Sequence, residues 1–183
     1  MIEVEIRAKI QDPEKVKQRL KDLRVELFKT EKQIDHIFGR DKDLDENHKM
    51  IEGRFVARLR ERNNQVSLEF KEIKRSGAGL EISSPLSKLE DGQSFLASLD
   101  FKKAFAIVKQ REIYRYQDCE ICLDSVDSLG QFVEIEYIGQ ADGEKTALEK
   151  CRDLLRALDP TAISEPKKYG DLMQEMINKR KTA

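Results

Sequence analysis

The sequence predicts an α+β protein in which helices flank an antiparallel β-sheet. Several stretches alternate between apolar and charged residues, which is the two-residue period of a half-buried strand. Asn63 and Asn64 predict a short hairpin turn between two of these stretches. Other stretches carry apolar residues at the spacing of a helix. With 183 residues, the chain has the length of one domain. We expect a single domain over residues 1–183, with a core from residue 1 to about residue 175 and a short basic tail.

The first strand shows the alternation most clearly. Its apolar positions are Ile2, Val4, Ile6, Ala8 and Ile10, and the positions between them are Glu3, Glu5, Arg7 and Lys9. Successive side chains of a strand point to opposite faces, so one face is apolar and the other carries two carboxylates and two cations. Strands of this kind that close into a barrel enclose a wet, charged cavity that holds ions or ligands. The alternative is a solvated sheet face with cross-strand ion pairs, each worth about 0–1 kcal/mol.

The remaining elements follow in order. Helices are predicted at four places, after the cap and first-turn proline at Asp12 and Pro13, over 86–99, after Asp142 and after Pro166. Further strands are predicted near 25–38, 53–62, 65–73, 79–84, 103–117, 118–125 and 131–138. Cys119 and Cys122 have the CxxC spacing of redox and metal sites, but an alternating strand turns the two sulfurs to opposite faces.

The composition excludes several functional classes. Charged residues make up 38% of the chain, yet 34 Lys and Arg face 35 Asp and Glu. A nucleic-acid binder normally has a basic excess, so no nucleic-acid partner is expected. No stretch has the roughly 20 apolar residues of a membrane span, and the first residues do not resemble a signal peptide. The three cysteines are an odd number, which favours a reducing compartment. We therefore expect a cytoplasmic protein that does not bind membranes.

Alternation sorts the charged residues into two chemical groups. The carboxylates are suited to hard divalent cations such as Mg²⁺ or Mn²⁺, and they are Glu3, Glu5, Asp124, Glu134 and Glu136. The cations are suited to phosphate oxygens, and they are Arg7, Lys9, Arg58, Arg60, Lys71, Lys109 and Arg111. Acidic and basic groups in one cavity suit a polyanion that is bound together with its metals.

Six motifs in a fixed order resemble the CYTH family, the triphosphate tunnel metalloenzymes. They are Glu3-x-Glu5-x-Arg7, Arg58 with Arg60, the strand ending in Lys71, Lys109 with Arg111, the segment 123–136 and the segment 166–172. The resemblance runs from residue 1 to about residue 175 and is nearest the class IV adenylyl cyclase-like branch. It implies an eight-stranded antiparallel barrel whose charged tunnel uses the carboxylates above for metal. The matched cations would bind a triphosphate, and Glu81 falls at a further acidic position of the tunnel.

Two departures from the family pattern bear on the chemistry. Arg7 replaces the motif lysine, so a cation remains without a titratable amine, and Lys9 follows two residues later. Ile37 and Phe38 occupy the region where hydrolytic members often have a tyrosine. His36 is a candidate acid or base there, with a hydrogen-bonded structural histidine as the alternative.

The resemblance leaves two reactions open. In a cyclase the ribose 3′-hydroxyl attacks the α-phosphorus of ATP and pyrophosphate leaves; in a triphosphatase water attacks the terminal phosphorus of a nucleoside, thiamine or inorganic triphosphate. The C-terminal motif and the missing tyrosine favour the cyclase. Lys9, Lys71 and Arg111 are the expected catalytic cations. A non-catalytic nucleotide or polyphosphate sensor is a third hypothesis, but a pure phosphate binder would not need the carboxylates. A homodimer is left open.

Overall fold

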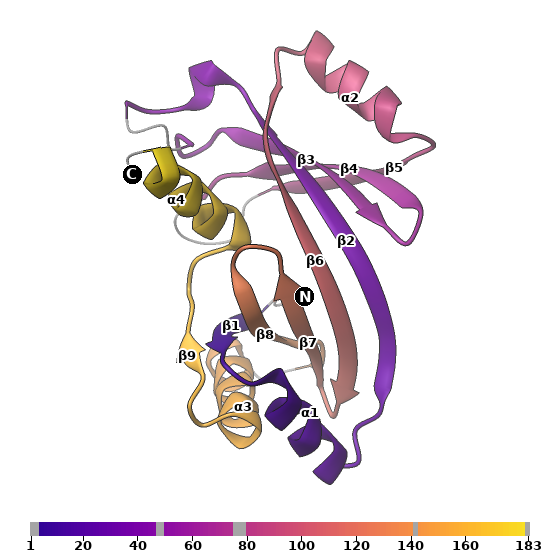
Figure 1. The fold of residues 1–183 in the computed structure, drawn as a ribbon, viewed down its shortest axis with the longest axis vertical. Coiled ribbons are helices and arrows are strands. Elements are labelled where there is room, and N and C mark those ends of the chain that lie inside the picture. The colour runs from indigo at the N-terminus through magenta and orange to yellow at the C-terminus, as the bar shows by residue number, and fades with distance from the viewer. Residues whose placement is uncertain (1–3, 47–49, 75–79, 141–142, 182–183) are drawn as a thin grey trace. The chain divides into compact units, whose positions relative to one another are not determined.

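The computed structural model describes residues 4–46, 50–74, 80–140 and 143–181 (Figure 1). Glu3, one of the predicted metal-side carboxylates, lies outside the described residues. The described chain divides into two compact units. Unit 1 contains residues 1–31 and 109–183, and unit 2 contains residues 32–108. Each is described separately below.

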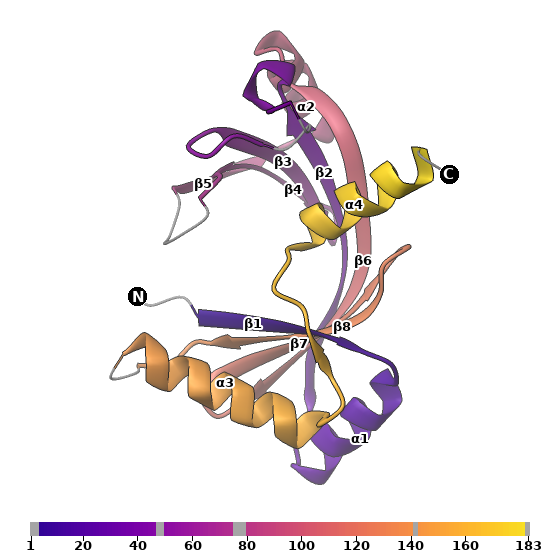
Figure 2. The same cartoon turned by 90° about the vertical axis from the view of Figure 1, so that its left-hand side faces the viewer.

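Unit 1 consists of antiparallel strands, with two of its three helices packed on their apolar face. The strands are β1 (Val4–Ile10), the second part of β6 (Lys102–Tyr116), β7 (Cys119–Val126), β8 (Gly130–Tyr137) and the two-residue β9 (Ile163–Ser164). The helices are α1 (Pro13–Asp22), α3 (Glu144–Leu158) and α4 (Tyr169–Lys181). Figure 2 shows α1 and α3 on the same side of β1, β7 and β8.

The core of unit 1 explains why its other sheet face is charged. Val4, Ala8 and Ile10 of β1 pack with Val16 and Leu20 of α1 and with the apolar side of α3. The alternating Glu5, Arg7 and Lys9 therefore point away from this core. Asp12 caps α1, because its carboxylate accepts hydrogen bonds from the amides of Glu14 and Lys15.

Unit 2 is built on a meander of β2 (Leu27–Gly39, of which residues 32–39 belong to this unit), β3 (Phe55–Arg62), β4 (Gln65–Glu72) and β5 (Glu81–Leu86), with α2 (Leu89–Ser98) on its apolar face. Asn63 and Asn64 have φ angles of +46° and +68°, as the predicted tight hairpin requires. Gly92 sits inside α2, where glycine is normally unfavourable. A Cβ atom there would lie 2.6 Å from the side chains of Leu59 and Leu86, so the glycine allows α2 to approach β3 and β5 closely.

The fold class is confirmed as antiparallel α+β, and one detail of it was wrong. The predicted barrel had eight strands, whereas the described residues form nine, in the hydrogen-bonded order β5-β4-β3-β2-β6-β7-β8-β1-β9. This sheet is open. The neighbours of β1 are β8 and β9, both in unit 1. In the described part of the chain, no helix is long and apolar enough to cross a membrane.

Candidate functional site

Each unit carries a cluster of ion pairs on the sheet face opposite its apolar core. The unit 1 cluster contains Arg7, Lys109, Arg111, Asp124, Glu134 and Tyr169. The unit 2 cluster contains Asp35, Arg58, Arg60, Glu69, Lys71 and Glu81. Strand register places the partners side by side, since Arg7 is opposite Glu134, Arg111 opposite Asp124, and Arg60 opposite Asp35. Together the clusters hold most of the site residues predicted from alternation.

Asp124 is the most enclosed member of the unit 1 cluster. It is 1% exposed and accepts a hydrogen bond of 2.7 Å from Nε of Arg111. The Tyr169 hydroxyl donates to its Oδ2 at 2.9 Å, and Nζ of Lys109 lies 3.5 Å away. Burial alone would raise the pKa of Asp124. The hydrogen bond from Arg111 and the charges of Lys109 and Arg111 outweigh it, so the pKa is lowered and the carboxylate stays ionised.

Arg7 and Arg111 share the second buried carboxylate, Glu134. Nε of Arg7 donates to Oε1 of Glu134 at 2.6 Å, and a nitrogen of Arg111 contacts Oε2. Burial disfavours the charged form of Arg7, but the negative charge of Glu134 outweighs it and the pKa of Arg7 is raised. Arg7 therefore remains a cation and cannot accept a proton, as the sequence indicated.

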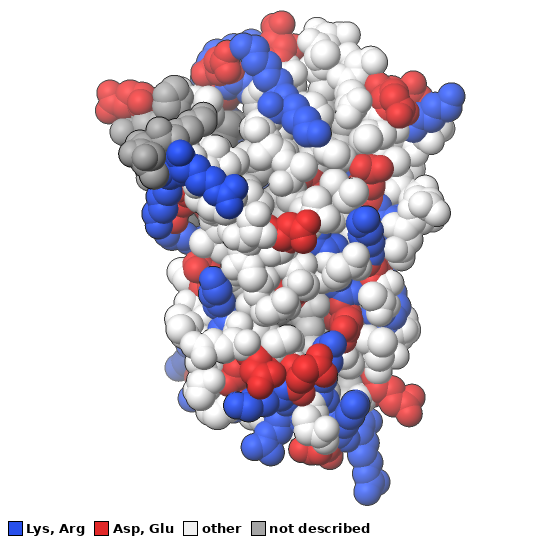
Figure 3. Space-filling view, viewed as in Figure 1, with Lys and Arg blue, Asp and Glu red and all other residues white. Residues whose placement is uncertain are grey.

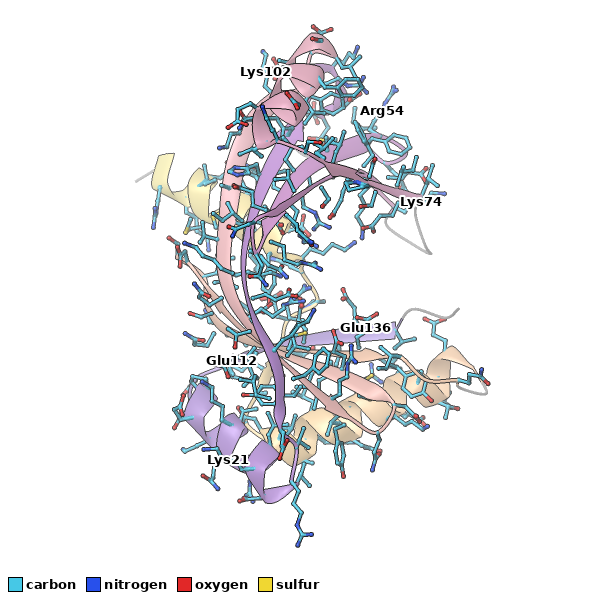
Figure 4. The ribbon with its side chains drawn as sticks, turned by 90° about the vertical axis from the view of Figure 1, so that its right-hand side faces the viewer. Lys21, Arg54, Lys74, Lys102, Glu112 and Glu136 are labelled. Atoms are coloured by element: carbon cyan, nitrogen blue, oxygen red, sulfur yellow. The ribbon has the colours of Figure 1, made fainter. Side chains whose placement is uncertain are left out.

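The remaining charged residues of β1 are more accessible. Lys9 is exposed, and its Nζ lies 5.8 Å from the centroid of the Phe132 ring. Among the residues that the structure describes, Lys9 has no carboxylate partner. Glu5 has a side chain that is 56% exposed and is the register partner of Glu136, which is labelled in Figure 4. The accessible groups of this strand are thus one cation and one carboxylate.

The predicted metal-side carboxylates fit a divalent metal in their chemistry, because carboxylate oxygens are the preferred ligands of Mg²⁺ and Mn²⁺. Glu5, Asp124, Glu134 and Glu136 all lie on the same face of unit 1. Asp124 and Glu134 are committed to Arg7 and Arg111 in this structure. Residues 4–46, 50–74, 80–140 and 143–181 bring no three carboxylate, histidine or cysteine groups close enough to hold a metal ion.

The unit 2 cluster also has three cations, but it pairs them with three carboxylates, and Arg58 and Lys71 are more exposed than the cations of unit 1. Arg60 forms a two-pronged hydrogen bond with Asp35, at 2.6 and 2.8 Å. Nε of Arg58 donates to Glu69 at 2.6 Å, and Nζ of Lys71 donates to Glu81 at 2.7 Å. The side chains of Lys71 and Glu81 are 41% and 43% exposed. Partial burial would raise the pKa of Glu81, but the hydrogen bond from Lys71 prevails and lowers it.

Three members of these clusters were missed by the sequence reasoning as site residues. Glu69 shares a strand face with Lys71, and Asp35 is the register partner of Arg60. Alternation places Glu69 correctly, but only strand pairing brings Asp35 to Arg60. Tyr169 belongs to the C-terminal motif, and nothing in the sequence shows that its hydroxyl reaches Asp124.

Other candidates lie elsewhere. His36 is on the opposite face of β2 from Asp35, where its Nε2 lies 2.7 Å from Oε1 of Glu61, so the hydrogen-bonded structural histidine fits best. Cys119 lies in the core of unit 1 and Cys122 on the opposite, charged face, as expected for an alternating strand. Burial raises the pKa of Cys122 to about 12, so it remains a neutral thiol.

On the face drawn in Figure 3, basic and acidic side chains are interspersed.

Comparisons with known proteins identify the family. The CYTH domain model matches residues 1–169. A Methanocaldococcus jannaschii protein, named as a candidate adenylate cyclase, is 33% identical over 164 residues, which cover 87% of this chain and 90% of that protein. A Pyrococcus horikoshii structure matches with a TM-score of 0.74 at 24% identity, covering 96% of this chain and 99% of that one.

A further structure is from Hippeastrum, and it is described as a candidate adenylyl cyclase with a dominant triphosphatase activity. It matches with a TM-score of 0.69 at 17% identity, covering 95% of this chain and 96% of that one. The two structural matches are below 25% identity and support the fold alone. The family model extends over both units, and so do the motifs of β1, β3, β6 and β8. The chain belongs to the CYTH domain family.

Proposed function

We propose that this protein is a divalent-metal-dependent enzyme that acts on a triphosphate and converts ATP to cyclic AMP and pyrophosphate. The observation that carries the proposal is that the CYTH motif residues form two clusters of arginines, lysines and carboxylates on charged sheet faces. Membership of the family supports triphosphate chemistry with a divalent metal. The name of the Methanocaldococcus jannaschii relative supports the cyclase over other reactions.

The cations are proposed to bind phosphate by exchanging partners. Without substrate, Arg58, Arg60 and Lys71 bind carboxylates, which keeps neighbouring cations from repelling one another. A triphosphate offers the same type of acceptor oxygens, and arginine forks match phosphate as well as carboxylate. Lys109 and Arg111 are the corresponding cations of unit 1. Lys9 needs no exchange, because none of the described carboxylates binds it.

The carboxylates Glu3, Glu5, Asp124, Glu134 and Glu136 would hold Mg²⁺ or Mn²⁺, which neutralises phosphate charge and orients the reacting groups. Glu5 is the most accessible of the four that are described. Lys9, Lys71 and Arg111 are proposed to stabilise the negative charge that develops as pyrophosphate leaves. Arg7 cannot accept the 3′-hydroxyl proton, and Lys9 can accept it only as a neutral amine, so Lys9 serves either as this acceptor or as a phosphate-binding cation, not as both at once.

A triphosphatase is the second candidate, and the Hippeastrum neighbour favours it, because its described activity is dominated by triphosphate cleavage. Its substrate would be tripolyphosphate, thiamine triphosphate or a nucleoside triphosphate. Ile37 argues for the cyclase: it is the register partner of Arg58 and lies on the face of Asp35, so this position supplies no tyrosine hydroxyl. A non-catalytic sensor is less favoured, because it would not need the metal-side carboxylates. A cytoplasmic location and a homodimer remain predictions.

Product analysis tests the proposal. Purified protein is incubated with ATP, tripolyphosphate or thiamine triphosphate, each with Mg²⁺ or Mn²⁺, and cyclic AMP, pyrophosphate and phosphate are measured. The proposal predicts equal amounts of cyclic AMP and pyrophosphate from ATP. Faster cleavage of tripolyphosphate or thiamine triphosphate without cyclic AMP would replace the cyclase by a triphosphatase.

A further inference from the structure

We propose that Arg7 is a positioning residue, which fastens residues 165–169 to the carboxylates of the unit 1 cluster and does not bind the triphosphate itself. This inference rests on the proposed function. It departs from the phosphate-ligand role that the motif resemblance implies for position 7, and it depends on the residue being arginine in this chain.

Both the side chain and the backbone of Arg7 hold the C-terminal segment. Nη1 of Arg7 donates to the carbonyl oxygen of Lys167 at 2.7 Å. The carbonyl oxygen of Arg7 accepts a hydrogen bond of 2.9 Å from the amide of Glu165. At the same time Nε of Arg7 donates to Glu134 at 2.6 Å. One residue thus ties the segment before α4 to a buried carboxylate on β8.

Arg7 also orients Tyr169, the first residue of α4. Its guanidinium carbon lies 4.4 Å from the centroid of the Tyr169 ring, a cation–π contact. The ring also makes an edge contact with Phe132, with centroids 5.1 Å apart, and Nζ of Lys109 lies 5.1 Å from its centroid. In this position the Tyr169 hydroxyl donates to Oδ2 of Asp124, whose Oδ1 accepts from Arg111. Arg7 therefore acts on Asp124 and Arg111 through Tyr169.

The contacts of Arg7 leave its guanidinium little access to a phosphate. Its side chain is 10% exposed, and Nε and Nη2 face Glu134 while Nη1 faces the backbone of Lys167. A lysine has a single nitrogen and cannot form this fork while it stacks on a ring. Lys9 lies on the same strand face, is exposed and has no partner among the described carboxylates. We therefore assign the two residues different roles. Arg7 is a clamp, which means that it fastens residues 165–169 to the unit 1 cluster, and Lys9 is the phosphate ligand.

The test compares Arg7→Lys with Tyr169→Phe and with a matched control, Arg115→Lys. Arg115 also pairs with a carboxylate, Glu120, and lies over an aromatic ring, that of Phe28, but it does not contact the C-terminal segment. Amide hydrogen exchange of residues 165–173 is measured together with calorimetric binding of tripolyphosphate in Mg²⁺. Steady-state kinetics with the substrate that is turned over give kcat and KM separately.

The clamp predicts that Arg7→Lys speeds exchange in residues 165–173 by about 10–100-fold, the effect of losing a hydrogen bond to a charged group. It predicts that kcat falls by about tenfold or more, because the site is misplaced, while tripolyphosphate affinity changes by less than about twofold. Tyr169→Phe should lower kcat in the same way, and Arg115→Lys should change neither the exchange rate nor kcat.

If Arg7→Lys weakens tripolyphosphate binding by about tenfold with unchanged exchange, Arg7 is a direct ligand and the clamp is wrong. If the wild type neither binds nor cleaves a triphosphate, the proposed function fails, and the exchange measurement alone still decides whether Arg7 holds the segment.

Discussion

The two ion-pair clusters use the same charged residue types but differ in their most exposed pair. In unit 1, Asp124 and Glu134 are 1% and 8% exposed, and Tyr169 covers them. In unit 2, Asp35 and Glu69 are likewise 5% and 8% exposed, but the side chains of Lys71 and Glu81 are 41% and 43% exposed. A buried pair that loses one partner leaves an uncompensated charge in the interior, which is strongly destabilising. An exposed pair contributes little to stability and opens at little cost.

This difference separates structural from exchangeable ion pairs. The pairs of Asp124 and Glu134 stabilise unit 1, so releasing Lys109 or Arg111 to a phosphate costs more than releasing Lys71 from Glu81. The same comparison shows that stability and substrate binding need not be lost together.

The largest effect is expected from Asp124→Ala. This change leaves Arg111 and Lys109 without their shared carboxylate, and we expect the free energy of unfolding to fall by about 3–5 kcal/mol. Urea denaturation measures the difference. The control is Asp153→Ala, which breaks a pair with Arg156 whose side chains are 70% and 72% exposed and should cost at most about 1 kcal/mol. Equal losses in the two variants would contradict the distinction between buried and exposed pairs.

Glu5→Gln should abolish most activity without affecting stability. The amide keeps the size of the side chain but is a poorer ligand for a divalent metal, and we expect turnover to fall by about 100-fold or more. The melting temperature should not change, because the Glu5 side chain is 56% exposed. Glu134→Gln provides the contrast, since it should lower both turnover and melting temperature. Metal-dependent turnover that survives in Glu5→Gln would remove Glu5 from the metal site.

Lys71→Ala should weaken binding of a non-hydrolysable triphosphate by about 1–3 kcal/mol, the range for a hydrogen bond between charged groups. Its melting temperature should stay the same, because the pair with Glu81 is half exposed. Calorimetry in Mg²⁺ measures the affinity. Lys150→Ala is a suitable control, because Lys150 also pairs with a carboxylate, Asp118, at similar exposure and belongs to neither cluster. A loss of stability with normal binding would make the Lys71 pair purely structural.

A gradual effect is expected from pH. The pKa of Asp124 is lower in the folded protein than its ordinary value of about 4, mainly because of Arg111 and Lys109, which overcome the effect of burial. The stability from this carboxylate is therefore fully present above about pH 4 and is lost as the pH falls through the folded-state pKa. Asp124→Asn should flatten this part of the stability profile. An unchanged profile would show that other carboxylates determine the acid response.

The sequence predicted the elements of the fold more completely than the pairing of its charges. Alternation and turn residues located the longer strands, because a period of two directly reflects which side chains are buried. The two-residue β9 was missed, since it is too short to show a period. Alternation also placed Arg58 and Arg60, and Lys109 and Arg111, on shared faces. It could not show that Asp35 pairs with Arg60 or that Tyr169 reaches Asp124, because both contacts depend on elements far apart in the chain.

The motif resemblance likewise identified positions better than roles. It indicated that position 7 carries a cation, and the structure shows that this arginine is bound to Glu134 and to the backbone of Lys167. Which partner a long side chain chooses depends on register and packing, which the sequence of one strand does not contain.

The central claim is that this CYTH protein performs metal-dependent chemistry on a triphosphate. Phosphorus NMR of the protein with ATP tests it most directly, recorded once with Mg²⁺ and once with excess EDTA. We predict that pyrophosphate and cyclic AMP appear together and in equal amounts with Mg²⁺, and that ATP stays intact in EDTA. Loss of ATP at the same rate in EDTA, or intact ATP and tripolyphosphate with both Mg²⁺ and Mn²⁺, would contradict it.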